Sequence, residues 1–257
     1  MDTTQGVLNL YKKRGETPLE RLNRYKDNHP EFKNVKMTYA GRLDPLAEGV
    51  LIVLFGEKIK NKEKYIALDK KYEFRAILGV ETDTYDVLGK VKSVKSKVES
   101  VKKENIEKEI ENFIGKRTQE YPTFSSRTVK GKALFDWAKE GRLSEIKIPK
   151  REIEIYKLQL INEKTITKRN LEKLVFSSIT KVKGDFRQKE IKRGWEKFFE
   201  KSATNKFQTI RCTISCSSGT YIRAITYILG RNLIIGATAI SIIRTAVGSY
   251  SIHDSLR

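Results

Sequence analysis

The chain has 257 residues, enough for one large domain or two modest ones around a buried core. Hydrophobic residues make up 39% of it and aromatic residues 9%, a composition that excludes disorder throughout and indicates a globular protein. The 52 Lys and Arg residues against 32 Asp and Glu residues give a formal charge of +20. We therefore expect a polyanionic partner, because neutralising phosphates releases their counterions.

Two sequence features narrow the class of protein further. No basic segment leads into an apolar one at the N-terminus, and no run of about eighteen apolar residues occurs, so we expect a cytoplasmic protein without a membrane anchor. The two cysteines, Cys212 and Cys216, are far in sequence from His29 and His253. This spacing excludes a disulfide framework and predicts no metal site.

The N-terminal part of the chain predicts two strands and a helix. Alternating apolar residues predict a strand over residues 6–11. Thr17 and Glu20 have the spacing of a capping box, so a helix should begin there and end near Asn28. The short apolar run of residues 50–55 is rich in β-branched side chains and predicts a buried strand.

The middle part predicts a strand, two helices and two polar segments. Alternation over residues 71–80 predicts a strand, and the loop 81–89 after it can hydrogen-bond its own backbone through Thr and Asp side chains. An apolar stripe predicts a helix over residues 103–114. Residues 121–132 interleave basic and aromatic side chains, which suits a surface that meets RNA, and a short helix over residues 134–138 follows.

The C-terminal part predicts further strands and helices. Strands are predicted over residues 153–161, 207–216 and 240–247, with a tail at 250–252, and helices over 221–229 and, as a basic pair, within 168–201. The basic faces of that pair either bind a polyanion or are simply solvated. Because no internal repeat or low-complexity linker interrupts the chain, we expect one continuous domain over residues 1–257.

One loop carries a candidate reactive carboxylate. Asp44 precedes Pro45, lies between Gly41 and Gly49, and is followed by the buried strand predicted at residues 50–55. An irregular loop anchored on core structure can hold a reactive side chain and leave it accessible. Asp and Pro are also ordinary turn residues, so a plain turn is the alternative.

A candidate partner for this carboxylate lies far along the chain. Arg223 falls in the first turn of the helix predicted at residues 221–229, near the positive end of the helix dipole, where a cation is disfavoured. Its presence there suggests a specific carboxylate partner. An exposed arginine is the alternative.

Five motifs, in their order along the chain, resemble those of the TruB family, bacterial pseudouridine synthases that modify the T-loop uridine of transfer RNA. They are Gly41-Arg42-Leu43-Asp44-Pro45, Lys71-Tyr72, Thr82-Asp83-Thr84 between Gly79 and Gly89, Ser125-Ser126 ahead of Gly131, and Ser218-Gly219-Thr220-Tyr221-Ile222-Arg223. The resemblance implies an α+β pseudouridine synthase fold, with a long mixed, mostly antiparallel sheet, flanking helices and a central cleft. It also implies one catalytic domain without the separate C-terminal RNA-binding (PUA-type) domain of many members.

The resemblance implies roles for residues of these motifs. Asp44 would be the nucleophile or base of the isomerisation, and attack on the ribose or on the uracil ring are both open. Arg223 would make a bidentate contact with Asp44 and keep it ionised. Tyr72 would lie against the uracil ring and take the C5 proton. The target base would be everted into a pocket walled by Tyr221 and Ile242.

The resemblance also implies how RNA is bound. Tyr39 stands where the family often has a histidine, and we expect it to stack on a neighbouring base, although it cannot carry a proton near neutral pH as imidazole does. The basic helices within residues 168–201 would add to the grip. The expected partner is the T-arm of a tRNA bound by a monomer, with no metal, nucleotide or redox cofactor. The residues expected to contact RNA are Arg42, Lys71, Arg127, Lys130 and Lys132.

Two other classes of function fit parts of the sequence. A non-catalytic RNA-binding protein or tRNA folding chaperone would share the charge, but it has no need of Asp44, Tyr72 and Arg223 together. A glycoside hydrolase could use Asp83 and Asp86 as paired carboxylates. A charge of +20 suits neutral sugars poorly, and salt-sensitive binding would separate the RNA-binding classes from this one.

Overall fold

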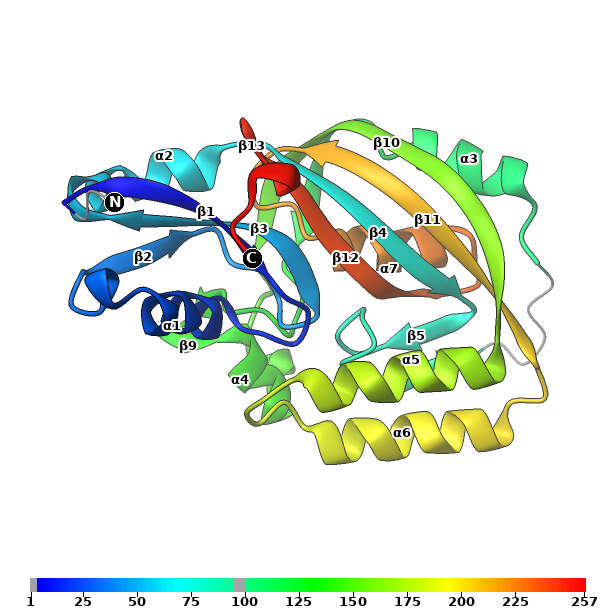
Figure 1. The fold of residues 1–257 in the computed structure, drawn as a ribbon. Helices are drawn as coiled ribbons and strands as arrows, with labels where there is room; N and C mark the ends of the chain where they lie inside the picture. Colours follow the sequence, from blue (N-terminus) through cyan, green and yellow to red (C-terminus); the bar gives the residue numbers. More distant parts are fainter. Residues whose placement is uncertain (1–3, 95–99) are drawn as a thin grey trace.

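The computed structural model describes residues 4–94 and 100–257. A long curved sheet runs through the molecule, with helices packed on both of its faces (Figure 1). In the described residues, its strands in spatial order are β1 (Gly6–Lys12), β3 (Ala47–Phe55), β12 (Ala237–Val247), β4 (Lys70–Leu78), β11 (Lys206–Cys216), β10 (Lys150–Thr167) and β7 (Gly115–Glu120), with β2 (Met37–Ala40) paired to β3 and β13 (Tyr250–Ser251) paired to β12. Neighbouring strands are antiparallel, except that β12 runs parallel to β3.

Short strand pairs and helices complete the described structure. The pairs are β5 (Val80–Thr82) with β6 (Val91–Val94) and β8 (Thr128–Val129) with β9 (Lys132–Ala133). The helices are α1 (Pro18–Asn28), α2 (Lys62–Ala67), α3 (Lys103–Glu111), α4 (Leu134–Lys139), α5 (Lys168–Lys181), α6 (Gln188–Lys201) and α7 (Ile222–Asn232), with 3-10 turns at Pro30–Phe32, Gly56–Asn61, Leu143–Glu145 and Ile252–Asp254.

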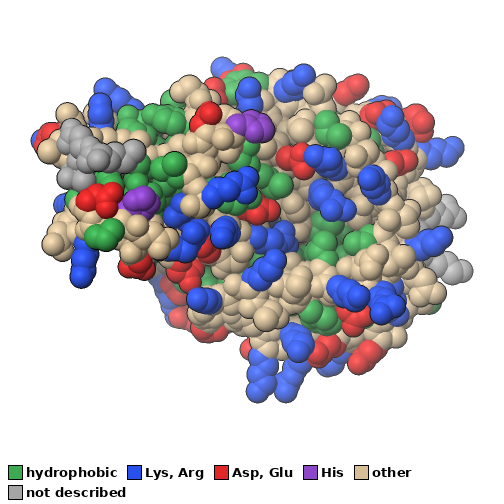
Figure 2. Space-filling model, in the orientation of Figure 1, with side chains coloured by type: hydrophobic (Ala, Val, Ile, Leu, Met, Phe, Trp, Pro, Cys, Tyr) green, Lys and Arg blue, Asp and Glu red, His purple; other side chains and the backbone are tan. Residues whose placement is uncertain are grey.

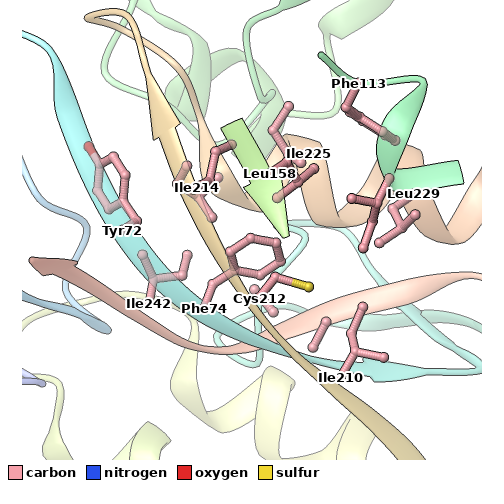
Figure 3. Packing of buried hydrophobic residues seen from close by; sticks show 14 of the residues in the cluster. Tyr72, Phe74, Phe113, Leu158, Ile210, Cys212, Ile214, Ile225, Leu229 and Ile242 are labelled. Atoms are coloured by element: carbon pink, nitrogen blue, oxygen red, sulfur yellow. The ribbon is translucent and has the colours of Figure 1, made fainter. Parts of the chain in front are cut away.

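Successive side chains of β4 point to opposite faces of the sheet, and different helices cover the two faces. Tyr72 and Phe74 point to the face covered by α3 and α7, and they belong to a large apolar cluster with side chains of β10, β11 and β12 (Figure 3). Ile77 points to the opposite face, where it packs in a second cluster with Trp195 of α6 and Phe207 of β11. The helical pair of α5 and α6 therefore covers one end of the sheet on the face opposite α7 (Figure 1).

Elements with a strong local signal agree with the prediction, and their ends differ. The helix predicted from the capping box is α1: the Thr17 hydroxyl accepts from the Glu20 amide, and the Glu20 carboxylate accepts from the Thr17 amide. The helix predicted to end at residue 114 ends at Glu111, because the chain turns towards β7 at Gly115, where φ is +100°.

Three strands begin or extend beyond their predicted ranges. β10 runs well past residues 153–161, because its polar ends pair with β7 on one side and with β11 at the far end. β3 begins at Ala47 and β12 at Ala237, where each finds a paired neighbour before its continuous apolar run begins. β2, β7 and α2 were not predicted, since their short segments carry little apolar periodicity.

On the face of the molecule drawn in Figure 2, basic and acidic side chains are intermixed. Figure 2 shows Lys and Arg side chains over most of the visible face, with Asp and Glu side chains between them. Within residues 4–94 and 100–257, no helix combines the length and the apolar character needed to cross a membrane.

Candidate active site

Asp44 lies in the loop between β2 and β3. The Asp44 carbonyl accepts from the Ala47 amide at 3.0 Å, and φ at Gly41 is +82°, so the loop turns tightly into the buried start of β3. Asp44 Oδ2 accepts a hydrogen bond from Nε of Arg223 at 2.7 Å. The Asp44 side chain is 39% exposed and that of Arg223 only 3%, so a buried cation holds a carboxylate that a substrate can still reach.

Arg223 contacts Asp44 through one nitrogen, and the expected bidentate contact is wrong. The helix α7 begins one residue before it, with Tyr221 as N-cap. Its Nη1 donates to the carbonyl of Thr84 and its Nη2 to the carbonyl of Phe124 at 3.3 Å, so these two carbonyls occupy the rest of the guanidinium. The arginine thus ties the Asp44 loop to two further segments.

Asp86 is a second carboxylate beside the same arginine. Its Oδ2 lies 3.6 Å from Arg223 Nε, while its Oδ1 accepts from the Thr84 hydroxyl at 2.7 Å and the Leu88 amide at 3.0 Å. Burial raises the pKa of Asp86, and Arg223 opposes this. Burial alone would lower the pKa of Arg223, but Asp44 and Asp86 outweigh it and raise that pKa above its usual range.

The position of Asp86 beside Asp44 and Arg223 is not predictable from the sequence. Its local pattern indicates a loop residue that bonds its own backbone, or half of a hydrolase pair. The expected self-bonding of the loop 81–89 is confirmed, since the Thr82 hydroxyl donates to the Asp86 carbonyl at 2.7 Å. No local signal distinguishes a carboxylate that bonds its own loop from one that also faces a distant arginine.

Two buried cations hold the backbone of the Asp44 loop. Lys12 Nζ donates to the carbonyls of Ala47 at 2.5 Å and Pro45 at 3.2 Å. Arg244 of β12 donates from Nε to the carbonyl of Val50 at 2.8 Å. Its Nη atoms donate to the carbonyls of Gly41 and Arg42 at 3.3 and 3.2 Å. Long cationic side chains therefore bind carbonyls of the loop and of the start of β3, and so fix the loop to the sheet.

Burial changes the acidity of two groups near this loop. Burial lowers the pKa of Lys12 to about 8, against the opposing effect of Asp44. Burial also raises the pKa of Tyr72 to about 12, and the neighbouring Arg244 opposes that rise by its charge and a hydrogen bond. The phenol is therefore neutral near pH 7, and any phenolate formed there would have a cationic partner.

A small pocket lies beside Asp44. It is lined by Arg14, Asp44, Leu46, Ala47, Asp86, Ala239, Ile240, Ser241 and Ile242. The structure thus brings Ile242 of β12 next to Asp44. Arg14 was not expected there; it reaches the pocket by donating to the Ser178 hydroxyl at 2.8 Å and to the Ile240 carbonyl at 2.9 Å.

A row of aromatic and basic side chains leads from Asp44 towards the surface. Burial raises the pKa of Tyr221, and the negative charge of Asp44 adds to the rise. The Tyr221 ring meets the Tyr121 ring edge-on at 5.7 Å, and Arg127 lies over the Tyr121 ring at 5.2 Å. These contacts connect Arg127 to Tyr221 through Tyr121, and the binding of a base by Tyr221 and of RNA by Arg127 stay predictions.

Three residues expected to contact a base or RNA lie outside the lining of this pocket, and their RNA contacts stay predictions. Tyr39 is not among the residues lining the pocket; it packs against the cluster between β1, β3 and α1, with Lys62 Nζ 5.9 Å from its ring centre. Lys71 is exposed on the face of β4 opposite Tyr72. Lys130 donates to the Glu145 carbonyl at 3.3 Å.

The other two basic residues of this group, Lys132 and Arg42, differ in whether their charge is already paired. Lys132 is ion-paired with Glu140 and lies over the Trp137 ring at 5.3 Å, so its charge is partly engaged. Arg42 is exposed on the loop that carries Asp44. In the ranges that the structure describes, no group of three or more His, Cys, Asp or Glu side chains is arranged to hold a metal ion.

Comparison with known proteins adds a family to this geometry. Residues 29–177 match the family described as TruB family pseudouridylate synthase (N terminal domain). A tRNA pseudouridine synthase B of Thermosipho melanesiensis is 29% identical over 251 residues, which cover 98% of this chain and 66% of that protein. One of Blochmanniella pennsylvanica is 34% identical over 247 residues, 95% of this chain and 75% of that protein.

Solved structures support the fold. A chain from the crystal structure of a Cbf5-Nop10-Gar1 complex is similar with a TM-score of 0.58 at 18% identity, over 97% of this chain and 50% of that chain. The expected α+β fold with a mixed, mostly antiparallel sheet is confirmed. This chain spans about two thirds of the Thermosipho protein. By the match over residues 29–177 and by these relatives, the chain belongs to the TruB family of pseudouridylate synthases.

Proposed function

We propose that the chain is a tRNA pseudouridine synthase that isomerises a T-loop uridine, expected at position 55, with Asp44 as the essential carboxylate. The observation that carries this proposal is the half-exposed Asp44 carboxylate held at 2.7 Å by buried Arg223. Relatives named tRNA pseudouridine synthase B over nearly the whole chain support the same activity.

The chemistry needs an ionised carboxylate beside the sugar and the ring. The reaction breaks the bond from ribose C1′ to N1, turns the uracil ring and joins C1′ to C5. C5 then loses its proton and N1 gains one, so the product is an isomer. Asp44 attacks the ribose or the ring with the oxygen that Arg223 leaves free, and the hydrogen bond from Arg223 holds the other carboxylate oxygen in place.

The surroundings of Asp44 supply the pocket for an everted base. Ile242 and Tyr221 wall the site, and the Tyr72 ring lies on β4 next to Arg244. Tyr72 takes the C5 proton as its phenolate, which Arg244 stabilises. Because burial raises the Tyr72 pKa to about 12, this step should be faster at higher pH, where more phenolate is present.

Basic residues near the pocket bind the tRNA. A groove beside α1 and the end of α5 has a mixed lining, and Arg14 also lines the Asp44 pocket. Its basic residues are Lys13, Arg14, Arg24, Lys181 and Lys183, and its acidic residues are Glu16, Glu20, Asp27 and Glu48, of which Glu16 is ion-paired with Arg24. We place the T-arm along this groove, with Arg42 and Arg127 as further contacts. A monomer is expected, and light scattering after size exclusion would test it.

The rival classes fit the geometry less well. Asp83 is ion-paired with Arg187, and Asp86 is buried, so these two carboxylates do not form an open pair for sugar hydrolysis. A non-catalytic RNA-binding protein needs no buried arginine behind an accessible carboxylate.

Tritium release from tRNA labelled at uracil C5 tests the proposal. The wild-type chain should release tritium from a T-loop uridine, and Asp44→Asn at the same salt concentration should release none while still binding the tRNA. The amide keeps the size of the side chain and removes the nucleophile. Tight binding by both proteins with release by neither would favour the non-catalytic RNA-binding class, and release by Asp44→Asn would remove Asp44 from its role.

A further inference from the structure

The helical pair of α5 and α6 is fixed to the segments around Arg223. Nε1 of Trp195, on α6, donates to the carbonyl of Val87 at 3.2 Å, and Lys90 is ion-paired with Glu190 of α6. The first contact joins α6 to the loop 81–89, which carries Asp86, and the second joins it to the residue directly after that loop. The pair is thus packed against the site and is not a free appendage (Figure 1).

Arg187 directly precedes α6, and its backbone conformation is unusual. It is the N-cap of α6 with φ of 63°, a left-handed conformation that non-glycine residues rarely adopt. Such conformations persist where surrounding contacts hold them, and they gather at functional sites. Here the contacts are those of the Arg187 side chain.

The Arg187 guanidinium binds two separate segments at once. Nη1 and Nη2 contact Oδ2 and Oδ1 of Asp83 at 2.7 and 3.3 Å, and the two side chains are only 15% and 12% exposed. The Arg187 Cζ atom also lies 3.9 Å from the centre of the Phe124 ring. A planar guanidinium can make both contacts, whereas an ammonium cannot.

These are the same two segments that Arg223 binds from the other side. Arg223 donates to the carbonyl of Thr84, next to Asp83, and to the carbonyl of Phe124 itself. Arg187 therefore fixes the acceptors that set the orientation of the Arg223 guanidinium. The orientation of that guanidinium in turn sets the position of the Asp44 carboxylate.

We propose that Arg187 is a positioning residue for pseudouridine formation: by binding Asp83 and Phe124, it fixes the two segments whose carbonyls orient Arg223 and, through Arg223, Asp44. This role rests on the proposed function. It requires no contact between Arg187 and the RNA, so it differs from that of a phosphate-binding arginine.

Kinetics of Arg187→Met separate these two roles. Methionine keeps an unbranched stem and removes the charge and the planar group. We expect kcat to fall on the order of 10- to 100-fold with KM for tRNA changed less than about twofold, because a small misplacement of reacting groups is costly. Arg187→Lys should recover part of the rate, since it can still pair with Asp83. A raised KM with unchanged kcat would overturn the proposal.

Lys189→Met is the matched control. It removes the same charge from an exposed position two residues away on α6, so kcat should stay near that of the wild type, and any contribution of this basic helix to RNA binding would appear in KM alone. A fall of kcat in this variant equal to that of Arg187→Met would assign the effect to surface charge and overturn the positioning role.

Hydrogen exchange gives a readout independent of activity. Arg187→Met should speed exchange at amides whose bonds depend on the two segments, such as Leu88 and Phe135, which donate to Asp86 Oδ1 and the Ser125 carbonyl. Lys189→Met should leave exchange at these amides unchanged. Unchanged exchange in both regions would overturn the proposal. If wild-type protein released no tritium, the proposed function would fail, and this exchange result would still decide whether Arg187 orders the segments.

Discussion

Around Asp44, single long cationic side chains hydrogen-bond backbone carbonyls and hold the backbone in place. Lys12, Arg223 and Arg244 each donate to backbone carbonyls in or beside the Asp44 loop and the loop 81–89, and each is almost completely buried. A carbonyl left unpaired in the interior is costly, so each cation fixes the backbone around the carboxylate as well as its charge. The residues of this group are therefore not interchangeable with other cations.

Arg223→Lys should remove most of the activity although it keeps the charge. One ammonium cannot reach Asp44, Thr84 and Phe124 together, whereas the guanidinium does. We expect kcat for tritium release to fall at least about 100-fold, as for other preorganised electrostatic groups. tRNA binding, measured at the same salt concentration, should persist. A rate near that of the wild type would show that the ion pair is not needed for turnover.

Lys12 should make stability depend on pH above neutrality. Its pKa is about 8 in the folded protein against 10.5 ordinarily, so between these values the unfolded chain binds more protons. The free energy of unfolding should therefore rise with pH in this window. Between pH 7.5 and 9.5 the rise should be about 2 kcal/mol larger for wild type than for Lys12→Met. Urea unfolding at both pH values measures it, and parallel changes in both proteins would contradict it.

At the scale of elements, local patterns predicted what one segment determines alone. The capping box of α1, the alternation of β4 and the self-bonded loop 81–89 all depend on neighbours within a few residues. The contacts of the active site, in contrast, join residues that are far apart in the sequence. Arg223 and Asp44 are 179 residues apart, and Arg187 and Asp83 are 104 apart.

The motif resemblance predicts that Asp44 and Arg223 lie together. It does not predict which residues outside the motifs contribute to the site. Lys12 directly follows the strand predicted at residues 6–11, and Arg244 lies within the strand predicted at residues 240–247. Neither position indicates a role at the site, because a buried cation facing carbonyls has no local signature. The far end of β10 is polar, and only its pairing with β11 makes it a strand. Whether Tyr39 stacks on a base stays a prediction.

The capping box of α1 gives a prediction at this scale. Thr17→Ala removes the side chain that accepts from the Glu20 amide, and the free energy of unfolding should fall by about 1 kcal/mol. Denaturant unfolding measures it. Leu19→Ala, at an exposed position of the same helix, is the control and should change stability by less than about 0.5 kcal/mol. Equal losses in the two variants would mean that the cap itself contributes little.

At the scale of the whole molecule, the charge of +20 should govern tRNA affinity more than its selectivity. Phosphate contacts carry little sequence information, so selectivity for one uridine has to come from contacts to the base itself. The basic residues at the end of α5 adjoin the pocket beside Asp44 through Arg14, and in the proposed function they would bind the backbone that flanks the everted nucleotide.

Removing two of these charges should weaken binding in a salt-dependent way. For the double variant Lys181→Ala/Lys183→Ala, the slope of log affinity against log salt concentration should become shallower by about 1 to 2. The double variant Lys103→Ala/Lys108→Ala removes the same charge from α3, far from the groove (Figure 1). Its slope should stay close to that of the wild type. Equal changes in both variants would mean that net charge, not this groove, sets the affinity.

The place of β12 has a consequence for synthesis of the chain. This late strand inserts between β3 and β4, and the backbone of Leu256 bonds to those of Asn9 and Tyr11. While a ribosome is still making residues 237–247, β3 and β4 have no partner on those edges, and unpaired edges invite aggregation. The nascent chain can therefore close its sheet and place Arg244 against the Asp44 loop only after residues 237–247 have emerged.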